Sequence, residues 1–279
     1  MKKVISASRR TDLVAFFPKW LAKALREENV RVVGPSGYAF NADLNPENIH
    51  TLVFWSKNYS NLINNSEGLL NLVKKYSQIY FHFTISGLGG TLIEPGAPSP
   101  HSAITQLDCL LEIAGLPERI SVRYDPVLFW KESGKVKNNL DFFEKLAVEL
   151  NSRGIKDVRF SFAQWYKKAQ RRAKINNFVY YDPLLEEKLK YTLYLVEIAV
   201  HRQIQLFSCS QDFLTALPGV LASACIDGSR LSQLHPHGES CSENKDRSQR
   251  EECRCTRSID IGSYQQKCPD VCIYCYASS

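Results

Sequence analysis

Short runs of β-forming residues alternate with helical stretches through most of this chain. Strands that are separated by helices form βαβ units, and such units build a parallel sheet. The alternation therefore predicts an α/β fold. We expect a (β/α) barrel, partial or complete, and a doubly wound open sheet is the alternative. The six predicted strands are Val4–Ser8, Thr51–Trp55, Ile79–Ile85, Arg119–Tyr124, Asp157–Phe162 and Gln203–Ser208.

The stretches between these runs carry apolar residues at helical spacing, notably over residues 16–25 and 140–150. A further helix is predicted to begin at Asp182 as the N-cap, with Pro183 in the first helical position, and to end near His201. The segment Arg31–Leu44 contains Pro35-Ser36-Gly37 between β-formers and predicts a hairpin. We expect a barrel domain over residues 1–205 and a cysteine-rich, cluster-binding segment over residues 206–279, packed on the barrel rim.

Composition narrows the class of protein. The chain has 279 residues, of which 44% are hydrophobic and 23% charged, as expected for a globular protein with an apolar core. No apolar run reaches the roughly 18 residues that a membrane span needs, and residues 1–10 lack the apolar region of a signal peptide. We therefore expect a cytoplasmic protein. The net charge of +6 is a mild indication of anionic partners.

The cysteines are concentrated in the last part of the chain. Eight of the nine lie from Cys209 onward, a density that indicates metal binding in a cytosolic protein. Cys268, Cys272 and Cys275 are separated by three and two residues. Zinc usually takes four ligands in two pairs, whereas three thiolates on one loop hold three irons of a 4Fe–4S cluster and leave the fourth iron open.

This spacing, with Tyr274 before the last cysteine, resembles the cluster motif of radical S-adenosylmethionine enzymes. That resemblance implies a full or partial (β/α) barrel, S-adenosylmethionine on the open iron, and one-electron cleavage that yields a 5′-deoxyadenosyl radical. A longer ordered set of segments resembles the family called domain of unknown function 1848 over residues 4–277. The segments are ISASRRTD, VFWSKN, VRYDPV, SFAQWYKK, ACIDG, CRC, SIDIGSY and CPDVCIYCYA.

Four further cysteines fall within this family pattern: Cys209, Cys225, Cys253 and Cys255. Four thiolates complete a coordination sphere, so we expect a second 4Fe–4S cluster here, with structural zinc as the alternative. The spacing of Cys253 and Cys255 puts both side chains on one side of an extended segment. The competing interpretation is that two or three of the four are buried thiols.

Polar residues at the predicted strand ends indicate one shared site, because the chemistry of α/β folds lies at the carboxyl ends of the strands. We expect Arg9, Arg10, Asp12, Lys57, Arg123 and Asp125 to bind substrate or take part in catalysis, and Ser8, Trp55, His82, Tyr274 and Tyr276 to bind the cofactors. The alternatives are a solvated loop position for any of them, a strand end at Asp125-Pro126, and a core histidine at position 82.

Residues 165–174 (WYKKAQRRAK) place like charges four residues apart, which favours either an anion-binding face or a solvated helix. Taken together, the sequence predicts an oxygen-sensitive iron–sulfur enzyme that acts on a small or anionic substrate and takes electrons from a ferredoxin or flavodoxin. The rival is a zinc-stapled barrel that binds nucleic acid or a protein partner. A third alternative is an iron–sulfur redox enzyme that does not use S-adenosylmethionine.

Overall fold

A computed structural model of the chain describes residues 1–34, 37–263 and 265–275. These residues group into two compact units, each assembled from separate segments of the chain. Unit 1 consists of Met1–Phe83, Thr105–Ile120 and Ala224–Cys268, and unit 2 consists of Thr84–Ile104, Ser121–Ser223 and the residues from Pro269 onward. The predicted division of the chain at residue 205 stays a prediction.

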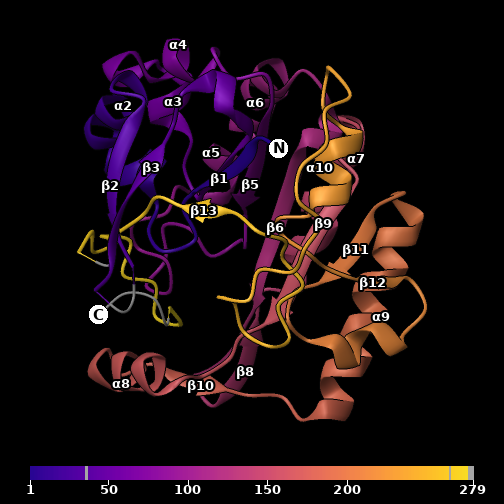
Figure 1. The fold of residues 1–279 in the computed structure, drawn as a ribbon. Coiled ribbons are helices and arrows are strands. Elements are labelled where there is room, and N and C mark those ends of the chain that lie inside the picture. The colour runs from indigo at the N-terminus through magenta and orange to yellow at the C-terminus, as the bar shows by residue number, and fades with distance from the viewer. Residues whose placement is uncertain (35–36, 264, 276–279) are drawn as a thin grey trace. The chain divides into compact units, whose positions relative to one another are not determined.

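Unit 1 contains four parallel strands in the order β13 (Ile259–Asp260), β1 (Lys3–Ala7), β4 (Ile49–Ser56) and β5 (Ile79–Thr84). Ile5 of β1 stands opposite Leu52 on one side and Ile259 on the other. Strand β13 therefore lies beside β1 although it comes late in the chain (Figure 1). This pairing brings the SIDIGSY segment against ISASRRTD.

Short helices and one hairpin surround these strands in unit 1. The hairpin pairs β2 (Asn29–Val33) with β3 (Ala39–Asp43), and it confirms the predicted hairpin, although Pro35 and Ser36 lie outside the described residues. The α-helices are α1 (Leu13–Phe16), α2 (Pro18–Arg26), α3 (Ser60–Ile63), α4 (Leu69–Val73), α6 (Gln106–Ala114) and α10 (Gly228–Gln233). The 3-10 turns are η1 (Pro46–Asn48), η2 (Ser66–Gly68) and η3 (Pro117–Arg119).

Unit 2 contains four further parallel strands in the order β6 (Ile120–Val127), β9 (Asp157–Phe162), β11 (Gln205–Ser208) and β12 (Val220–Ala222). A separate antiparallel sheet has the order β10 (Val179–Tyr181), β7 (Phe129–Glu132) and β8 (Lys135–Asn138). Helix α8 (Lys167–Ile175) leads into β10 (Figure 1). The remaining elements are α5 (Pro100–Ile104), α7 (Phe142–Ser152), α9 (Leu185–His201) and the 3-10 turn η4 (Asp212–Ala216).

The apolar core follows from these strands. In unit 1 the ring of Phe54 on β4 stacks on Phe81 of β5 at 5.9 Å, and Tyr59 meets Phe81 edge-on at 5.3 Å. In unit 2 Tyr124 of β6 packs on Phe143 of α7 at 5.1 Å. All of these side chains are almost completely buried, and buried aromatic rings contribute more to the stability of a core than most side chains do.

The predicted α/β class with parallel strands is confirmed. Each of the six predicted strands is present, with ends that differ by at most a few residues, and β6 continues through Asp125-Pro126 to Val127, so the strand does not end at that proline. No strand pairing among the described residues closes either set of four into a barrel, so closure stays a prediction.

The predicted start of the long helix is wrong by two residues. Helix α9 begins at Leu185 with Leu184 as its N-cap, instead of beginning at Pro183 behind Asp182. The carboxylate of Glu187 accepts hydrogen bonds from the Leu184 N–H and from the Tyr181 hydroxyl, both at 2.8 Å. The Glu187 side chain thus caps the helix at Leu184, and Pro183 lies outside the helix.

No helix formed by residues 1–34, 37–263 and 265–275 combines the length and the apolar character that crossing a membrane requires.

Candidate functional site

The carboxylate of Asp260, in β13, is the centre of the polar site in unit 1. It accepts hydrogen bonds from the Ser8 hydroxyl at 2.6 Å, the Arg9 N–H at 2.8 Å, the Ser6 hydroxyl at 2.9 Å and the Gly262 N–H at 3.0 Å. Asp260 is only 8% exposed. A buried carboxylate is stable only when donors satisfy its oxygens, and these donors tie Asp260 to the end of β1.

Gly262 is required by the same packing. A Cβ atom at this position would lie 2.0 Å from the Ser8 hydroxyl oxygen, which is closer than any real contact. The absence of a side chain thus lets residues 260–262 approach the end of β1. The Arg10 guanidinium also donates to the Gly262 carbonyl at 2.8 Å, which ties the two segments together a second time.

The Arg9 side chain extends from the end of β1 and contacts the C-terminal segment of unit 1. Its guanidinium donates to the Ser258 hydroxyl at 3.0 Å and lies 3.6 Å from carboxylate oxygens of both Asp246 and Asp260. Burial alone would lower the pKa of Arg9, but the negative charges of Asp260, Cys255, Asp246 and Cys253 outweigh burial and raise the pKa. The arginine is therefore a fixed cation beside two cysteines.

Three of the predicted metal ligands lie together beside this cation: Cys225, Cys253 and Cys255. The Ile226 N–H points to the Cys255 sulfur at 3.4 Å, and the Thr256 N–H donates to the Ile226 carbonyl at 2.8 Å, so the two segments run side by side. Hydrogen bonds to Cys225 and Cys253 raise the pKa of the Cys255 thiol. The bond from Cys255 also lowers the pKa of Cys253 to about 6.

The thiols are hydrogen-bonded to one another in this arrangement. Within the described ranges no group of three or more His, Cys, Asp or Glu side chains has an arrangement that could hold a metal ion. Of the other predicted ligands, Cys268 belongs to unit 1, while Cys209, Cys272 and Cys275 belong to unit 2. The Cys209 N–H continues the pairing of β11 with β9 by donating to the Phe160 carbonyl at 3.0 Å.

Trp55 and His82 connect Cys225 to the carboxylate site. The two rings stack with centroids 4.1 Å apart. The Trp55 indole N–H donates to the Ser6 hydroxyl at 3.0 Å, and His82 Nε2 lies 2.6 Å from the Cys225 carbonyl. A carbonyl accepts only, so His82 carries a proton on Nε2. The predicted residues Ser8, Trp55 and His82 therefore do lie in one site of unit 1.

Asp12 supports the ends of β1 and β4. Its carboxylate caps α1 by accepting the Ala15 N–H at 2.9 Å. It also accepts the Ser56 hydroxyl at 2.8 Å and the Lys57 N–H at 2.9 Å. These are the contacts of an N-cap that also anchors the neighbouring strand. Roles in catalysis for Asp12 and Lys57 stay predictions.

In unit 2 the end of β6 carries an ion pair. The Arg123 guanidinium donates to the Asp125 carboxylate, which also accepts the Ser161 hydroxyl of β9. Two predicted site residues thus pair with each other, and Ser161 fixes the orientation of the carboxylate. Any catalytic role for the pair stays a prediction.

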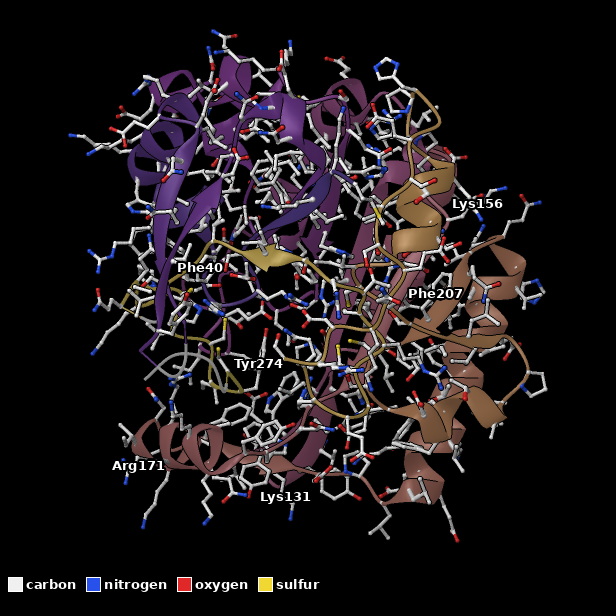
Figure 2. The ribbon with its side chains drawn as sticks, in the orientation of Figure 1. Phe40, Lys131, Lys156, Arg171, Phe207 and Tyr274 are labelled. Atoms are coloured by element: carbon white, nitrogen blue, oxygen red, sulfur yellow. The ribbon has the colours of Figure 1, made fainter. Side chains whose placement is uncertain are left out.

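The last described residues fold onto unit 2. The Cys275 N–H donates to the Cys272 carbonyl at 3.1 Å and closes a turn that carries both thiols. The Arg172 guanidinium of α8 donates to the carbonyls of Cys272 at 2.7 Å and Cys275 at 3.1 Å. Arg172 is one of the basic residues for which the sequence predicted either an anion-binding face or a solvated helix; its guanidinium contacts backbone carbonyls, and anion binding stays a prediction. By contrast Arg171, on the same helix, projects away from Tyr274 (Figure 2).

Tyr274 anchors the same turn. Its hydroxyl donates to the Glu94 carboxylate, and the neighbouring Ile273 N–H donates to the Ile93 carbonyl at 3.0 Å. Burial, followed by the charge of Glu94, raises the pKa of Tyr274, so the phenol stays protonated. Its ring packs on a core cluster of Leu88, Ile93 and Leu128. Tyr276, the other predicted tyrosine, lies outside the described residues.

Residues 4–277 match the family described as Domain of unknown function (DUF1848). The chain belongs to this family. No curated protein matches the chain. Membership in DUF1848 confirms the resemblance drawn from the sequence segments, and the family description assigns no activity. In this DUF1848 chain two of the segments that carry the resemblance, ISASRRTD and SIDIGSY, meet at Asp260.

Sequence reasoning missed two residues that organise these contacts: Asp260 in unit 1 and Glu94 in unit 2. Asp260 lies in the segment SIDIGSY. A single acidic residue in this β-rich run was the available signal of a functional carboxylate. Glu94 gave no such signal, because its partner Tyr274 lies far away in the sequence.

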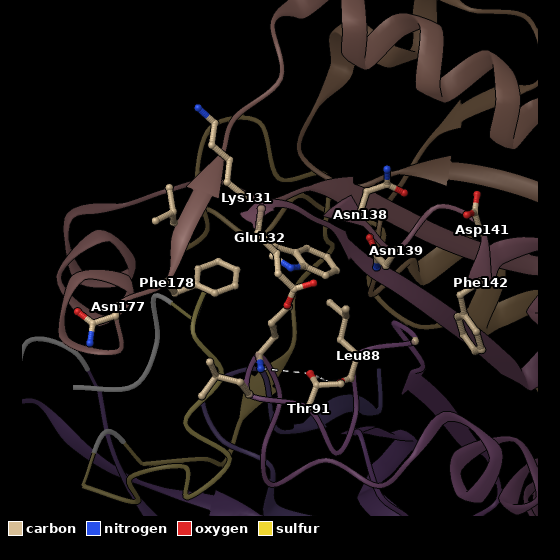
Figure 3. A pocket seen from close by; sticks show the side chains of 15 residues that line it. Leu88, Thr91, Lys131, Glu132, Asn138, Asn139, Asp141, Phe142, Asn177 and Phe178 are labelled. Atoms are coloured by element: carbon tan, nitrogen blue, oxygen red, sulfur yellow. Dashed lines mark hydrogen bonds between the residues drawn. The ribbon is translucent and has the colours of Figure 1, made fainter. Parts of the chain in front are cut away.

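A pocket of about 550 Å³ in unit 2 shares its lining with the core cluster that holds the tail turn. Leu88, Phe178 and Glu132 surround its centre, and Asn138 and Asp141 lie on one side (Figure 3). This volume and the mixture of aromatic, amide and carboxylate groups suit a small organic molecule.

A buried histidine pair, His50 and His235, gives unit 1 a pH dependence. The rings lie 4.3 Å apart, and His235 Nε2 has no hydrogen-bond partner among the described residues. Burial is the main cause that lowers the pKa of both. The charge of Lys2 also lowers both values, while Glu239 raises them and His237 lowers that of His235.

Because the folded state resists protonation of this pair, we expect the free energy of unfolding to fall as the pH drops through about 6.5, where unfolded histidines titrate. Urea denaturation between pH 7.5 and 5 checks this, with pH values chosen around that midpoint. His235→Gln should flatten the dependence, whereas His201→Gln, an exposed position in α9, should leave it unchanged. An unchanged slope in His235→Gln would contradict the assignment.

Proposed function

We propose that this DUF1848 protein is an iron–sulfur enzyme of the radical S-adenosylmethionine type. In this proposal Cys268, Cys272 and Cys275 hold a 4Fe–4S cluster with one open iron, and the parallel strands form a partial or complete (β/α) barrel. When bound, such a cluster supplies the single electron that cleaves a carbon–sulfur bond of S-adenosylmethionine. The support is the cysteine spacing, together with the surroundings of the turn that carries two of the three thiols.

Those surroundings suit a negatively charged group. The Arg172 cation lies against the turn because it donates to the carbonyls of Cys272 and Cys275. Thiolate is the form of cysteine that binds iron, and a bound cluster with its thiolates carries negative charge. The Tyr274 ring is partly buried against Leu88, Ile93 and Leu128, and restricted solvent access is one of the factors that set a cluster's potential.

The second cysteine set is proposed to hold another 4Fe–4S cluster, with Cys209, Cys225, Cys253 and Cys255 as ligands and structural zinc as the alternative metal. The observation that carries the metal-binding proposal is the contact of Cys225, Cys253 and Cys255 beside Arg9. The two segments that bring them together are themselves paired through backbone hydrogen bonds.

The proposed substrate is a small molecule, and the pocket in Figure 3 offers room for one. Arg9, Arg10 and Lys57 at the ends of β1 and β4 favour an anionic group on a substrate. A ferredoxin or flavodoxin is the proposed electron donor. The proposed location is the cytoplasm, where thiols remain reduced and available to iron.

Anaerobic purification followed by iron and sulfide analysis tests this function. We expect brown protein with about eight irons and eight sulfides per chain, four for each cluster. Electron paramagnetic resonance of the reduced protein should show 4Fe–4S signals, and incubation with dithionite and S-adenosylmethionine should release 5′-deoxyadenosine.

Two outcomes would contradict the proposal, and each would favour one of the alternatives. Colourless protein with tetrahedral zinc and no sulfide would favour a zinc-stapled protein that binds nucleic acid or a partner. Iron and sulfide without 5′-deoxyadenosine would favour an iron–sulfur redox enzyme that does not use S-adenosylmethionine.

A further inference from the structure

A second pocket lies in unit 1, at the amino ends of β1 and β13, and none of its lining residues is a proposed metal ligand. Its volume is about 650 Å³. Four cationic side chains line it: Lys2 and Lys3 from the start of β1, and Arg247 and Arg257 from the C-terminal segment. Positive charges that surround one cavity repel one another and destabilise the fold unless negative charges offset the repulsion.

The protein itself compensates little of this charge. Lys2 is paired with Glu239 at 2.8 Å. Among the described residues, Lys3, Arg247 and Arg257 have no carboxylate partner. Three positive charges therefore remain available to a ligand in the pocket.

The one carboxylate of the lining, Asp246, is engaged within the protein. Its Oδ1 accepts the Ser248 N–H at 3.0 Å and the Ser248 hydroxyl at 2.6 Å. Its Oδ2 lies 3.6 Å from the Arg9 guanidinium. Asp246 is 7% exposed, so its charge is balanced by Arg9 and contributes little repulsion toward an anion in the pocket.

Two hydroxyl groups in the pocket lining can donate hydrogen bonds to a ligand. The Ser258 oxygen accepts a hydrogen bond from Arg9 at 3.0 Å, and the Ser242 oxygen accepts one from the Asn244 N–H at 3.4 Å. Each oxygen has thus taken a hydrogen bond from the protein and keeps its own hydrogen to give. Cations together with hydroxyl donors form the surroundings that phosphate oxygens prefer.

We propose that this pocket binds the phosphate group of a small phosphorylated molecule. The volume exceeds that of a phosphate ion and lies in the range of ligand pockets, which leaves room for an organic part. The cations surround one cavity, whereas a protein that tracks a nucleic-acid backbone places them along an extended groove. The proposal does not depend on the iron–sulfur assignment.

Calorimetric titration of the full chain with inorganic phosphate and with adenosine 5′-monophosphate, at constant ionic strength, tests the proposal. We expect saturable 1:1 binding of both. The double variant Arg247→Gln, Arg257→Gln should weaken binding at least about tenfold, because it removes two cations that can form charge-assisted hydrogen bonds to phosphate. Both arginines are exposed, so their replacement should not disturb folding.

The matched control is Lys19→Gln, Arg31→Gln, which removes the same charge from exposed positions of unit 1 outside the pocket and should leave binding unchanged. Tighter binding of the monophosphate than of inorganic phosphate would support an ester, and equal binding a free ion; both support a phosphate site. The proposal is overturned if neither probe saturates or if both double variants weaken binding equally. It is also overturned if only a single-stranded oligonucleotide binds, with an affinity that falls steeply as salt rises.

Discussion

Replacing Asp260 by alanine is expected to lower the free energy of unfolding by about 3–5 kcal/mol, the usual cost of removing one partner of a buried charge pair. The change leaves the Arg9 cation with one carboxylate fewer and removes the acceptor of four hydrogen bonds. Because these donors come from β1, from the two residues that follow Ala7 and from residue 262, the pairing of β1 with β13 should loosen as well. Urea denaturation followed by circular dichroism measures the loss.

Asp227→Ala is the matched control for this experiment. Asp227 is also in unit 1 and accepts backbone N–H groups of Ser229 and Arg230 as the N-cap of α10. Its loss should cost about 1 kcal/mol, as for other N-caps. If Asp260→Ala costs no more than Asp227→Ala, then Asp260 is not the central anchor of the site.

Removing cysteines in pairs is expected to remove one cluster at a time. Cys272→Ser, Cys275→Ser should lose about four of the eight irons and all S-adenosylmethionine cleavage, because one cysteine cannot retain a 4Fe–4S cluster. Cys225→Ser, Cys253→Ser should also lose about four irons, and it should keep the signal of the open cluster. Iron analysis and electron paramagnetic resonance of anaerobic protein distinguish the two variants.

The control for these variants is Cys109→Ala, Cys241→Ala. Cys109 lies on α6, and the buried Cys241 thiol donates to the Gly228 carbonyl at 3.4 Å. Neither belongs to the proposed ligand sets, so the iron content should stay at about eight per chain. If the tail variant retained all of its iron, the open cluster could not depend on Cys272 and Cys275, and the proposed function would fail.

The strands could be predicted from the sequence because each is a short apolar run between helical segments. The β7–β8 hairpin was missed for the opposite reason. Most of β8 and the end of β7 are exposed, so these strands lack the buried pattern on which the prediction depended. The Ser133-Gly134 turn, with positive φ at both residues, was the available local signal.

The candidate site was predictable only where it follows from strand ends. Ser8, Arg9, Trp55 and His82 were predicted from their positions and lie together in unit 1. Their partner Asp260 was not predicted, because only the parallel pairing of β13 with β1 brings it there, and a two-residue strand gives no periodic signal. Contacts between segments so far apart depend on tertiary structure, which local patterns do not encode.

Each unit is assembled from separate segments of the chain, and this has a consequence for its folding during biosynthesis. The fourth parallel strand of unit 1 is made of residues 259 and 260, and the tail turn of unit 2 follows residue 268. Neither unit can be completed before these residues have left the ribosome, so unit 1 cannot finish folding before most of unit 2 has been synthesised. Nascent chains that stall before Cys253 would therefore contain neither of the proposed cysteine sets in assembled form.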